Sequence, residues 1–196
     1  PILGVNMGRL GFLTDLSPAE FRAGLPMLQS GQFSIVEHLM FECSHHREDG
    51  TVIRDLGLNE VTINSAGSLK MLDISLRIDE EFVTTFSCDG LIVSTPVGST
   101  AHNLSAGGPI LRQDLRAFVI TPICPHTLTV RPIVDSADRS FRLSVKDAPA
   151  GVRIVIDGQI SRPIESRDFI VVRKAPQTLK LVRLPGHSYY GTLHRK

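Results

Sequence analysis

The sequence predicts a mainly β protein, in which two antiparallel sheets pack as a sandwich and helices are few. Short stretches of alternating apolar and polar residues recur along the chain, most clearly where Leu72, Ile74, Leu76 and Ile78 alternate with polar side chains. Strands with one apolar and one polar face are typical of antiparallel sheets that cover a core on one side. Because few stretches have a helical pattern, packed sheets are expected rather than packed helices.

The other strands are predicted from the same alternation or from short apolar runs. An apolar run at residues 2–5 predicts a buried strand at the start of the chain. From residue 33 onward the period is two, with His38 on the polar face. The apolar face of that strand is expected to hold Phe33, Ile35, Leu39, Phe41 and Cys43. Further strands are expected near residues 58–64, 81–86, 90–94, 117–122, 140–146, 152–156, 169–173 and 179–184.

One helix is predicted over residues 18–30. Ser17 or Asp15 would cap its start, and Glu20, three residues after Ser17, would complete a capping box. A proline suits the first helical turn, and Gly31 ends the pattern. The apolar residues that recur at helical spacing are Phe21, Leu25 and Leu28.

The composition fits a globular protein: of 196 residues, 42% are hydrophobic and 21% are charged. Lys and Arg number 21 against 20 Asp and Glu, so the net charge of +1 creates no broad field, and any anion site must be local. The basic residues are scattered and tryptophan is absent, which argues against a nucleic-acid partner. The sequence shows no membrane-span or signal-peptide pattern, so we expect a cytoplasmic protein without a membrane partner.

The cysteines and histidines do not indicate a metal centre. Cys43, Cys88 and Cys124 are widely spaced and form no C-x-x-C pair, which disfavours both a disulfide framework and a zinc site. Cys88 stands beside an aspartate and could be a nucleophile, but a free cysteine is usually a small buried apolar residue. The histidines lack metal-ligand spacing, and His45 and His46 precede a polar turn that favours a solvated loop.

The segment of residues 89–109 carries the most specific pattern. It predicts a buried strand, a turn at 96–98, and a short helix capped by Ser99 or Thr100 and closed by two glycines. A strand that runs into a small-residue helix start presents free backbone N–H groups to a polar ligand. The alternative is an ordinary tight connection in which small residues serve packing. The segment is no P-loop, because it lacks the lysine of that motif.

Two shorter motifs add to this segment. Asn59 and Glu60 place a carboxamide beside a carboxylate, a pair suited to reading vicinal ribose hydroxyls, although such a dipeptide also suits a turn. Asp157 and Gly158, followed by Gln159, predict a hairpin turn after the strand at 152–156.

Together these segments resemble the NAD kinases, which phosphorylate NAD with ATP or polyphosphate. The resemblance implies a two-domain enzyme, with an N-terminal α/β domain for the phosphate donor and a C-terminal β-sandwich domain for the dinucleotide. It also implies Mg²⁺ or another divalent ion, and a homodimer or homotetramer whose subunits share sites. The resembling stretches are residues 4–13, 59–61, 89–109, 120–128 and 157–159.

The resemblance also implies roles for individual residues. Asn59 and Glu60 would contact ribose hydroxyls, and Asp89 would do so on the other half of the dinucleotide. The segment from Thr100 to Ser105 would line the base and ribose pocket. The complete expected NAD-binding set is Asn59, Glu60, Lys70, Ser87, Asp89, Thr100, Ala101, His102, Asn103, Leu104, Ser105 and Gln159.

Two positions depart from the family pattern. Val97 stands where the family usually has Thr or Ser, and His102 stands where it usually has Tyr. A histidine can still stack on a base, and it titrates near neutral pH. We therefore expect the affinity for NAD, or the preference between NAD and NADH, to differ from the usual pattern.

No catalytic base is assigned within the chain. The family's base is the Asp of a Gly-Gly-Asp-Gly motif, and none of the three Asp-Gly pairs here follows two glycines. The chain also opens at Pro1 without Met, so we expect a piece that binds dinucleotide weakly or in a partner-dependent way and does not turn it over alone. Residues 1–13 would then be a remnant of the donor domain, 14–184 the dinucleotide-binding domain, and 185–196 a tail that packs towards the donor domain.

Two other functions stay open at this point. A lipid or sphingoid kinase of the same superfamily would share the two-domain plan, but its acceptor site should be apolar rather than suited to ribose. A non-enzymatic β-sandwich interaction module would need only the alternating strands. In that case an Asp89→Asn substitution should leave every ligand response unchanged.

Overall fold

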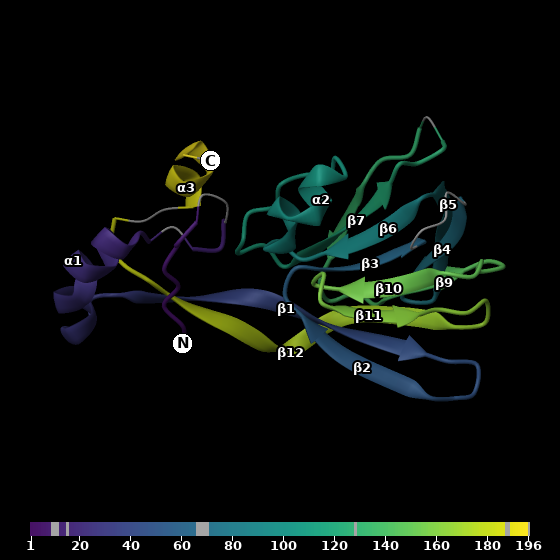
Figure 1. The fold of residues 1–196 in the computed structure, drawn as a ribbon, viewed down its shortest axis with the longest axis horizontal. Coiled ribbons are helices and arrows are strands. Elements are labelled where there is room, and N and C mark those ends of the chain that lie inside the picture. The colour runs from purple at the N-terminus through teal and green to yellow at the C-terminus, as the bar shows by residue number, and fades with distance from the viewer. Residues whose placement is uncertain (9–11, 15, 66–70, 128, 187–188, 196) are drawn as a thin grey trace.

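The computed structural model describes residues 1–8, 12–14, 16–65, 71–127, 129–186 and 189–195. Within these residues two antiparallel six-stranded sheets face each other (Figure 1), which confirms the predicted fold class. The first sheet contains β1 (Ser34–His46), β2 (Val52–Gly57), β4 (Leu72–Ile78), β5 (Glu81–Cys88), β9 (Phe141–Val145) and β12 (Phe169–Arg183). The second contains β3 (Glu60–Ser65), β6 (Gly90–Ser94), β7 (Ala117–Ile123), β8 (Ile133–Ser136), β10 (Val152–Ile156) and β11 (Ile160–Pro163).

The strand order places residues that are far apart in sequence side by side. The orders are β2-β1-β12-β9-β4-β5 and β11-β10-β3-β6-β7-β8. In the second sheet β3 therefore lies between β10 and β6, so that Glu60 pairs with Ser94 and Val61 with Ile156. The start of β3, the end of β6 and the end of β10 consequently meet at one end of this sheet.

The core lies between the sheets and is formed by the inward faces of both. Phe118 of β7 packs edge-on against Phe141 of β9, with ring centroids 5.5 Å apart, and this contact joins the two sheets. Gly57 shows how closely the core is packed, because a Cβ atom there would lie 2.2 Å from the Phe41 ring. The largest fully buried side chains are Phe41, Phe118, Phe141, Ile63, Leu72, Ile74, Leu76, Leu91, Ile92, Ile120, Leu143 and Ile154.

The predicted helix forms as α1 (Pro18–Gln29), with Ser17 as its cap. The Ser17 hydroxyl accepts a hydrogen bond from the Glu20 amide at 3.2 Å, and the Glu20 carboxylate accepts one from the Ser17 amide at 2.8 Å. Its apolar side is largely uncovered: Leu25 is 41% exposed, and the one buried residue within α1 is Gly24. The remaining helices are η1 (Gly98–Thr100), α2 (His102–Ser105) and α3 (Tyr189–Arg195).

The first half of β1 differs from the predicted faces of that strand. A bulge in the pairing with β12 shifts the register by two residues, from Leu39 with Thr178 to Phe41 with Lys174, and a two-residue shift keeps the faces of a strand. His38, predicted to be on the polar face, is buried at 1% exposure because the first residues of the chain pack over its side of the strand, while Ile35 is 48% exposed. His45, predicted to be in a solvated loop, lies in the buried end of β1 and bonds Asp168 at 2.8 Å.

Other strand predictions were also wrong in detail. The predicted strand at residues 2–5 forms only two isolated parallel bridges, between Ile2 and Leu181 and between Val5 and Leu16. The two strands predicted between residues 169 and 184 are the single strand β12, which pairs with β1 on both sides of the bulge. The strands β2, β8 and β11 were not predicted, since they are short or carry polar residues and proline, as edge strands often do.

Candidate functional site

The chain segments before β3 and after β6 are bonded to each other. The Thr95 amide donates to the Asn59 carbonyl at 2.9 Å, and the Thr95 hydroxyl donates to the Leu58 carbonyl at 2.6 Å. The Ser94 hydroxyl also donates to the Asn59 carbonyl, at 3.2 Å. A Cβ atom on Gly98 would lie 2.1 Å from the Asn59 carbonyl oxygen, so the approach of the two backbones requires glycine.

The helix predicted after the turn consists of two short pieces, and neither Ser99 nor Thr100 caps it. Neither of these two hydroxyls bonds an amide at the start of η1 or of α2, because both point back to carbonyl groups, and the Gly98 amide at the start of η1 instead donates to the Thr95 hydroxyl at 3.2 Å. Ser99 donates to Pro96 at 2.6 Å, and its oxygen accepts from the Leu111 amide at 3.0 Å. Thr100 donates to Val97 at 3.2 Å. The hydroxyls therefore hold the shape of the turn.

The Asn103 side chain holds the segment of residues 99–109 to the sheet. Its side chain is fully buried, and its amide nitrogen donates to the carbonyls of Ser99 and Pro109 at 3.0 and 3.1 Å. Its oxygen accepts from the Thr121 hydroxyl of β7 at 2.6 Å. A Cβ atom on Gly108 would lie 2.1 Å from that oxygen. The Asn103 side chain is thus used inside the protein, whereas its predicted neighbours His102, Leu104 and Ser105 are exposed.

Glu60 is a buried acid next to this turn. It is 7% exposed, and its Oε2 atom finds no hydrogen-bond partner among the described residues. Burial, together with the nearby negative charge of Asp157, raises the pKa of Glu60 to about 7. A carboxyl group in this state can donate a hydrogen bond as well as accept one near neutral pH.

Several of the predicted residues line one open hollow on the surface. Asn59, Thr100 and Ala101 line it together with Val97 and residues 12–14. Gln159 lies in the turn between β10 and β11, at the same end of the sheet, and is exposed. Residues 12–14 and Val97 were not predicted as lining residues, because their contribution depends on how the first residues of the chain fold back.

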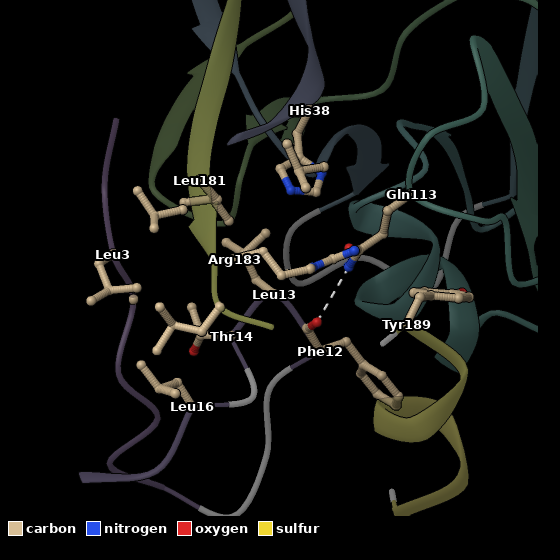
Figure 2. Close-up of a pocket in the computed structure, with 14 residues that line it drawn as sticks. Leu3, Phe12, Leu13, Thr14, Leu16, His38, Gln113, Leu181, Arg183 and Tyr189 are labelled. Carbon is tan, nitrogen blue, oxygen red and sulfur yellow. Dashed lines mark hydrogen bonds between the residues drawn. The ribbon is translucent and has the colours of Figure 1, made fainter. Parts of the chain in front are cut away.

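Gln113 fixes the position of that first segment. Its side chain donates to the Phe12 carbonyl at 3.2 Å, the bond drawn as a dashed line in Figure 2. Both residues line a cavity of about 40 Å³. The buried His38 ring lines the same cavity, and its Nδ1 atom has no hydrogen-bond partner among the described residues. Burial lowers the pKa of His38, and the Arg183 charge lowers it further. Residues 12–14 are thereby held between this cavity and the hollow.

The other predicted residues lie at the opposite end of β6. Asp89 precedes the strand and Thr95 follows it, and six residues of extended chain span about 20 Å. Asp89 is 53% exposed and pairs with His126 at 3.2 Å. The Ser87 hydroxyl donates to Asp73 at 2.5 Å. Lys70 lies outside the described residues.

The cysteines and acids add no further centre within the described part of the chain. Burial raises the pKa of the Cys88 thiol to about 12, which makes it a poor nucleophile. Among the described residues, no group of three or more His, Cys, Asp or Glu side chains could hold a metal ion. No helix among them is long and apolar enough to cross a membrane.

Residues 58–184 match the family model of the ATP-NAD kinase C-terminal domain. The matched range begins one residue before Asn59 and ends one residue after β12, so it covers both ends of β6. The chain belongs to the NAD kinase family. This membership confirms the resemblance inferred from the sequence motifs.

Individual relatives agree with this membership. The chain is 50% identical over its whole length to an NAD kinase of Rhodopirellula baltica and 38% identical to one of Carboxydothermus hydrogenoformans. It spans 63% and 70% of the lengths of these two relatives. The family's length therefore exceeds that of the chain.

Two solved structures share the fold. The crystal structure of yeast NADH kinase complexed with NADH has a TM-score of 0.88 and 26% identity, covering 98% of this chain and 56% of that one. The NAD kinase from Archaeoglobus fulgidus in complex with ATP has a TM-score of 0.82 and 30% identity, covering 100% of this chain and 74% of that one.

Proposed function

We propose that this chain supplies the dinucleotide-binding part of an NAD kinase. That enzyme would transfer the terminal phosphoryl group of ATP or polyphosphate to the 2′-hydroxyl of the adenosine ribose of NAD, giving NADP. The observation that carries the proposal is that Asn59, Thr100 and Ala101 line one hollow, and that the residue after Asn59 is the buried Glu60, whose Oε2 atom has no hydrogen-bond partner among the described residues. The lining of the hollow is mostly apolar, which suits a base, and Asn59 with the adjacent buried acid offers polar groups for the hydroxyls of a ribose.

The roles of the remaining residues follow from their exposure. His102, Leu104 and Ser105 are exposed and would contact the base and ribose directly. Asn103 would act through its backbone segment, since its side chain is bonded internally. Gln159 would reach the nucleotide from the β10–β11 turn.

Asp89 and Ser87 would serve a site shared between two copies of the chain. They lie about 20 Å from the hollow along β6, so one copy does not bring both sets together in a compact pocket. A homodimer or homotetramer would place the Asp89 end of one copy against the hollow of another. Lys70 lies outside the described residues, and its contact stays a prediction of the resemblance.

Co-expression of two single variants tests the shared site. Glu60→Ala and Asp89→Ala chains should each bind little NAD, whereas their random mixture should recover about a quarter of the wild-type sites, because one pairing in four joins two intact halves. The readout is the stoichiometry of NAD in a calorimetric titration. A mixture that binds no more than the separate variants would show that each site lies within one copy.

Phosphoryl transfer depends mainly on how the two substrates are positioned. Phosphoryl transfer needs the acceptor hydroxyl held in line with the donor, a group that takes its proton, and positive charge over the transferring oxygens. This chain would bind and orient the acceptor ribose. The base and the donor phosphates are not assigned to residues of the chain, and the expected divalent ion has no ligand group among the described residues, so no step is derived through it.

Titration of the purified chain with NAD tests the function. We expect saturable binding that falls at least about tenfold in Asn59→Ala, which corresponds to about 1.4 kcal/mol. Gln177→Ala, which removes an exposed carboxamide from β12, should bind like wild type. Thermal stabilisation by diacylglycerol instead of NAD would favour a lipid kinase, and no response to either would refute the proposal.

A further inference from the structure

Asp157 holds an unusual backbone conformation at the end of β10. Its φ is 49°, in the left-handed region, and Gly158 follows with a φ of 68°. These two residues with positive φ lie in the tight turn that joins β10 to β11, which the Gln159 amide closes by donating to the Ile156 carbonyl at 2.9 Å. Aspartate tolerates this conformation better than most residues, so the sequence pair suits the turn. The turn alone does not explain where the carboxylate points.

The Asp157 carboxylate is directed at the segment that precedes β3. It accepts hydrogen bonds from three consecutive backbone amides, those of Leu58, Asn59 and Glu60, at 2.7, 2.8 and 3.0 Å. The Asp157 amide in turn donates to the Glu60 carbonyl at 2.9 Å. Bonds to an ionised carboxylate are stronger than neutral ones. One side chain therefore fixes the backbone of both residues assigned to ribose contact.

The same carboxylate lies close enough to affect the Glu60 side chain. Among the described residues, Asp157 is the charged group that acts on Glu60, while the residue opposite Glu60 on β6 is the neutral Ser94. Glu60 is buried, and its Oε2 atom has no partner among those residues. A buried acid that faces a fixed negative charge favours its protonated form.

We propose that Asp157 is a positioning residue of the dinucleotide site: it holds Asn59 and Glu60 in the conformation that binds a vicinal diol of ribose, and it keeps Glu60 able to donate a hydrogen bond. This inference rests on the proposed function for the identity of the ligand. It assigns to Asp157 a role beyond its hairpin, exerted through the residues that it holds. Asp157 itself is given no ligand contact.

The test compares Asp157→Asn with wild type and with Asp79→Asn. Asparagine keeps the left-handed turn but loses the charge and part of the acceptor capacity. Asp79 is a matched control, because it also has a left-handed φ of 48° and accepts a backbone amide, that of Ser140 at 2.8 Å, on the other sheet. NAD affinity is measured by calorimetry between about pH 5.5 and 8.5, a range that brackets the titration of Glu60.

We expect NAD affinity to fall about tenfold in Asp157→Asn and to stay unchanged in Asp79→Asn. In wild type the affinity should decline as Glu60 loses its proton. In Asp157→Asn this decline should move to lower pH, because the opposing charge is gone. Loss of a turn residue alone would not move a pH profile. Unchanged affinity and an unchanged profile in Asp157→Asn would overturn the inference.

A second readout separates this inference from the proposed function. NMR titration of the Glu60 carboxyl and hydrogen exchange of the amides of residues 58–60 need no ligand. In Asp157→Asn the Glu60 pKa should fall and these amides should exchange faster. If wild type fails to bind NAD, the proposed function fails, while these two measurements still decide whether Asp157 positions the segment. Should Asp157→Asn not fold, Glu60→Gln in the wild-type background should abolish the pH dependence, and its persistence would refute the role of Glu60.

Discussion

The two ends of β6 differ in how their polar groups are satisfied. At the Thr95 end, the backbone of residues 58–60, the turn after β6 and the Asn103 side chain are held by buried and partly buried hydrogen bonds. At the Asp89 end, the main side-chain contact is that between Asp89 and His126, which are 53% and 51% exposed. Buried bonds are costly to leave unmade, whereas exposed pairs contribute little. The first end is therefore a preformed surface, and the second is open to a partner.

The largest effect on stability is expected at Gly98, which lies at the Thr95 end of β6 and has no room for a side chain. In Gly98→Ala the new Cβ would meet the Asn59 carbonyl at 2.1 Å, so the two segments must separate. We expect a loss of about 3 kcal/mol in the free energy of unfolding, measured in urea, together with loss of NAD binding. Gly8→Ala, where the nearest atom would lie at 4.0 Å, is the control. Equal stability of both variants would show that the two segments separate at no cost.

A smaller effect is expected at Asn103. Asn103→Ala removes three hydrogen bonds and leaves the Thr121 hydroxyl without its acceptor, so we expect a loss of about 2 kcal/mol. Thr121→Val removes only one of these bonds and should cost about 1 kcal/mol. Thermal or urea unfolding gives both values. If the two variants were equally stable, the bonds from Asn103 to Ser99 and Pro109 would contribute nothing.

The protonation of Glu60 should appear in the stability of the free protein. Burial and the Asp157 charge raise its pKa to about 7 in the folded chain, from the ordinary value of 4.5, so the folded state binds more protons than the unfolded state between these values. The free energy of unfolding should therefore fall as pH rises from about 4.5 to 7, by on the order of 1 kcal/mol. Urea unfolding over this range measures it. Glu60→Gln should flatten this part of the profile, and a parallel profile would contradict the raised pKa.

The smallest effect on stability is expected at the Asp89 end. His126→Ala and Asp89→Asn should each change the free energy of unfolding by no more than about 0.5 kcal/mol, since both side chains are half exposed. We expect Asp89→Asn nevertheless to weaken NAD binding, measured by calorimetry, which would show that this end of β6 serves binding rather than stability. A large loss of stability in either variant would show that this end is preformed as well.

The alternating segments of the sequence were sufficient for the architecture but not for its details. The alternation predicted the fold class, because it follows the side-chain period of a strand. Local motifs predicted the helix with its Ser17 cap and the Asp157 hairpin, because both depend on the chemistry of a few neighbouring residues. The burial of His38 left no clear local signal, because it depends on the first residues of the chain, which pack over that side of β1. The short edge strands were missed for a similar reason, since their pattern is weak.

The candidate site was likewise predicted only in part from the sequence. The sequence by itself determined which residue types are available: the Asn59-Glu60 pair, the turn from Thr95 to Ala101, and Asp89. Only the tertiary structure decided that β3 lies between β10 and β6, which brings the Asp157 carboxylate onto three amides and leaves Asp89 at the far end. Strand order depends on the packing of the whole chain, because residues about 100 positions apart must meet, and no local pattern encodes that distance.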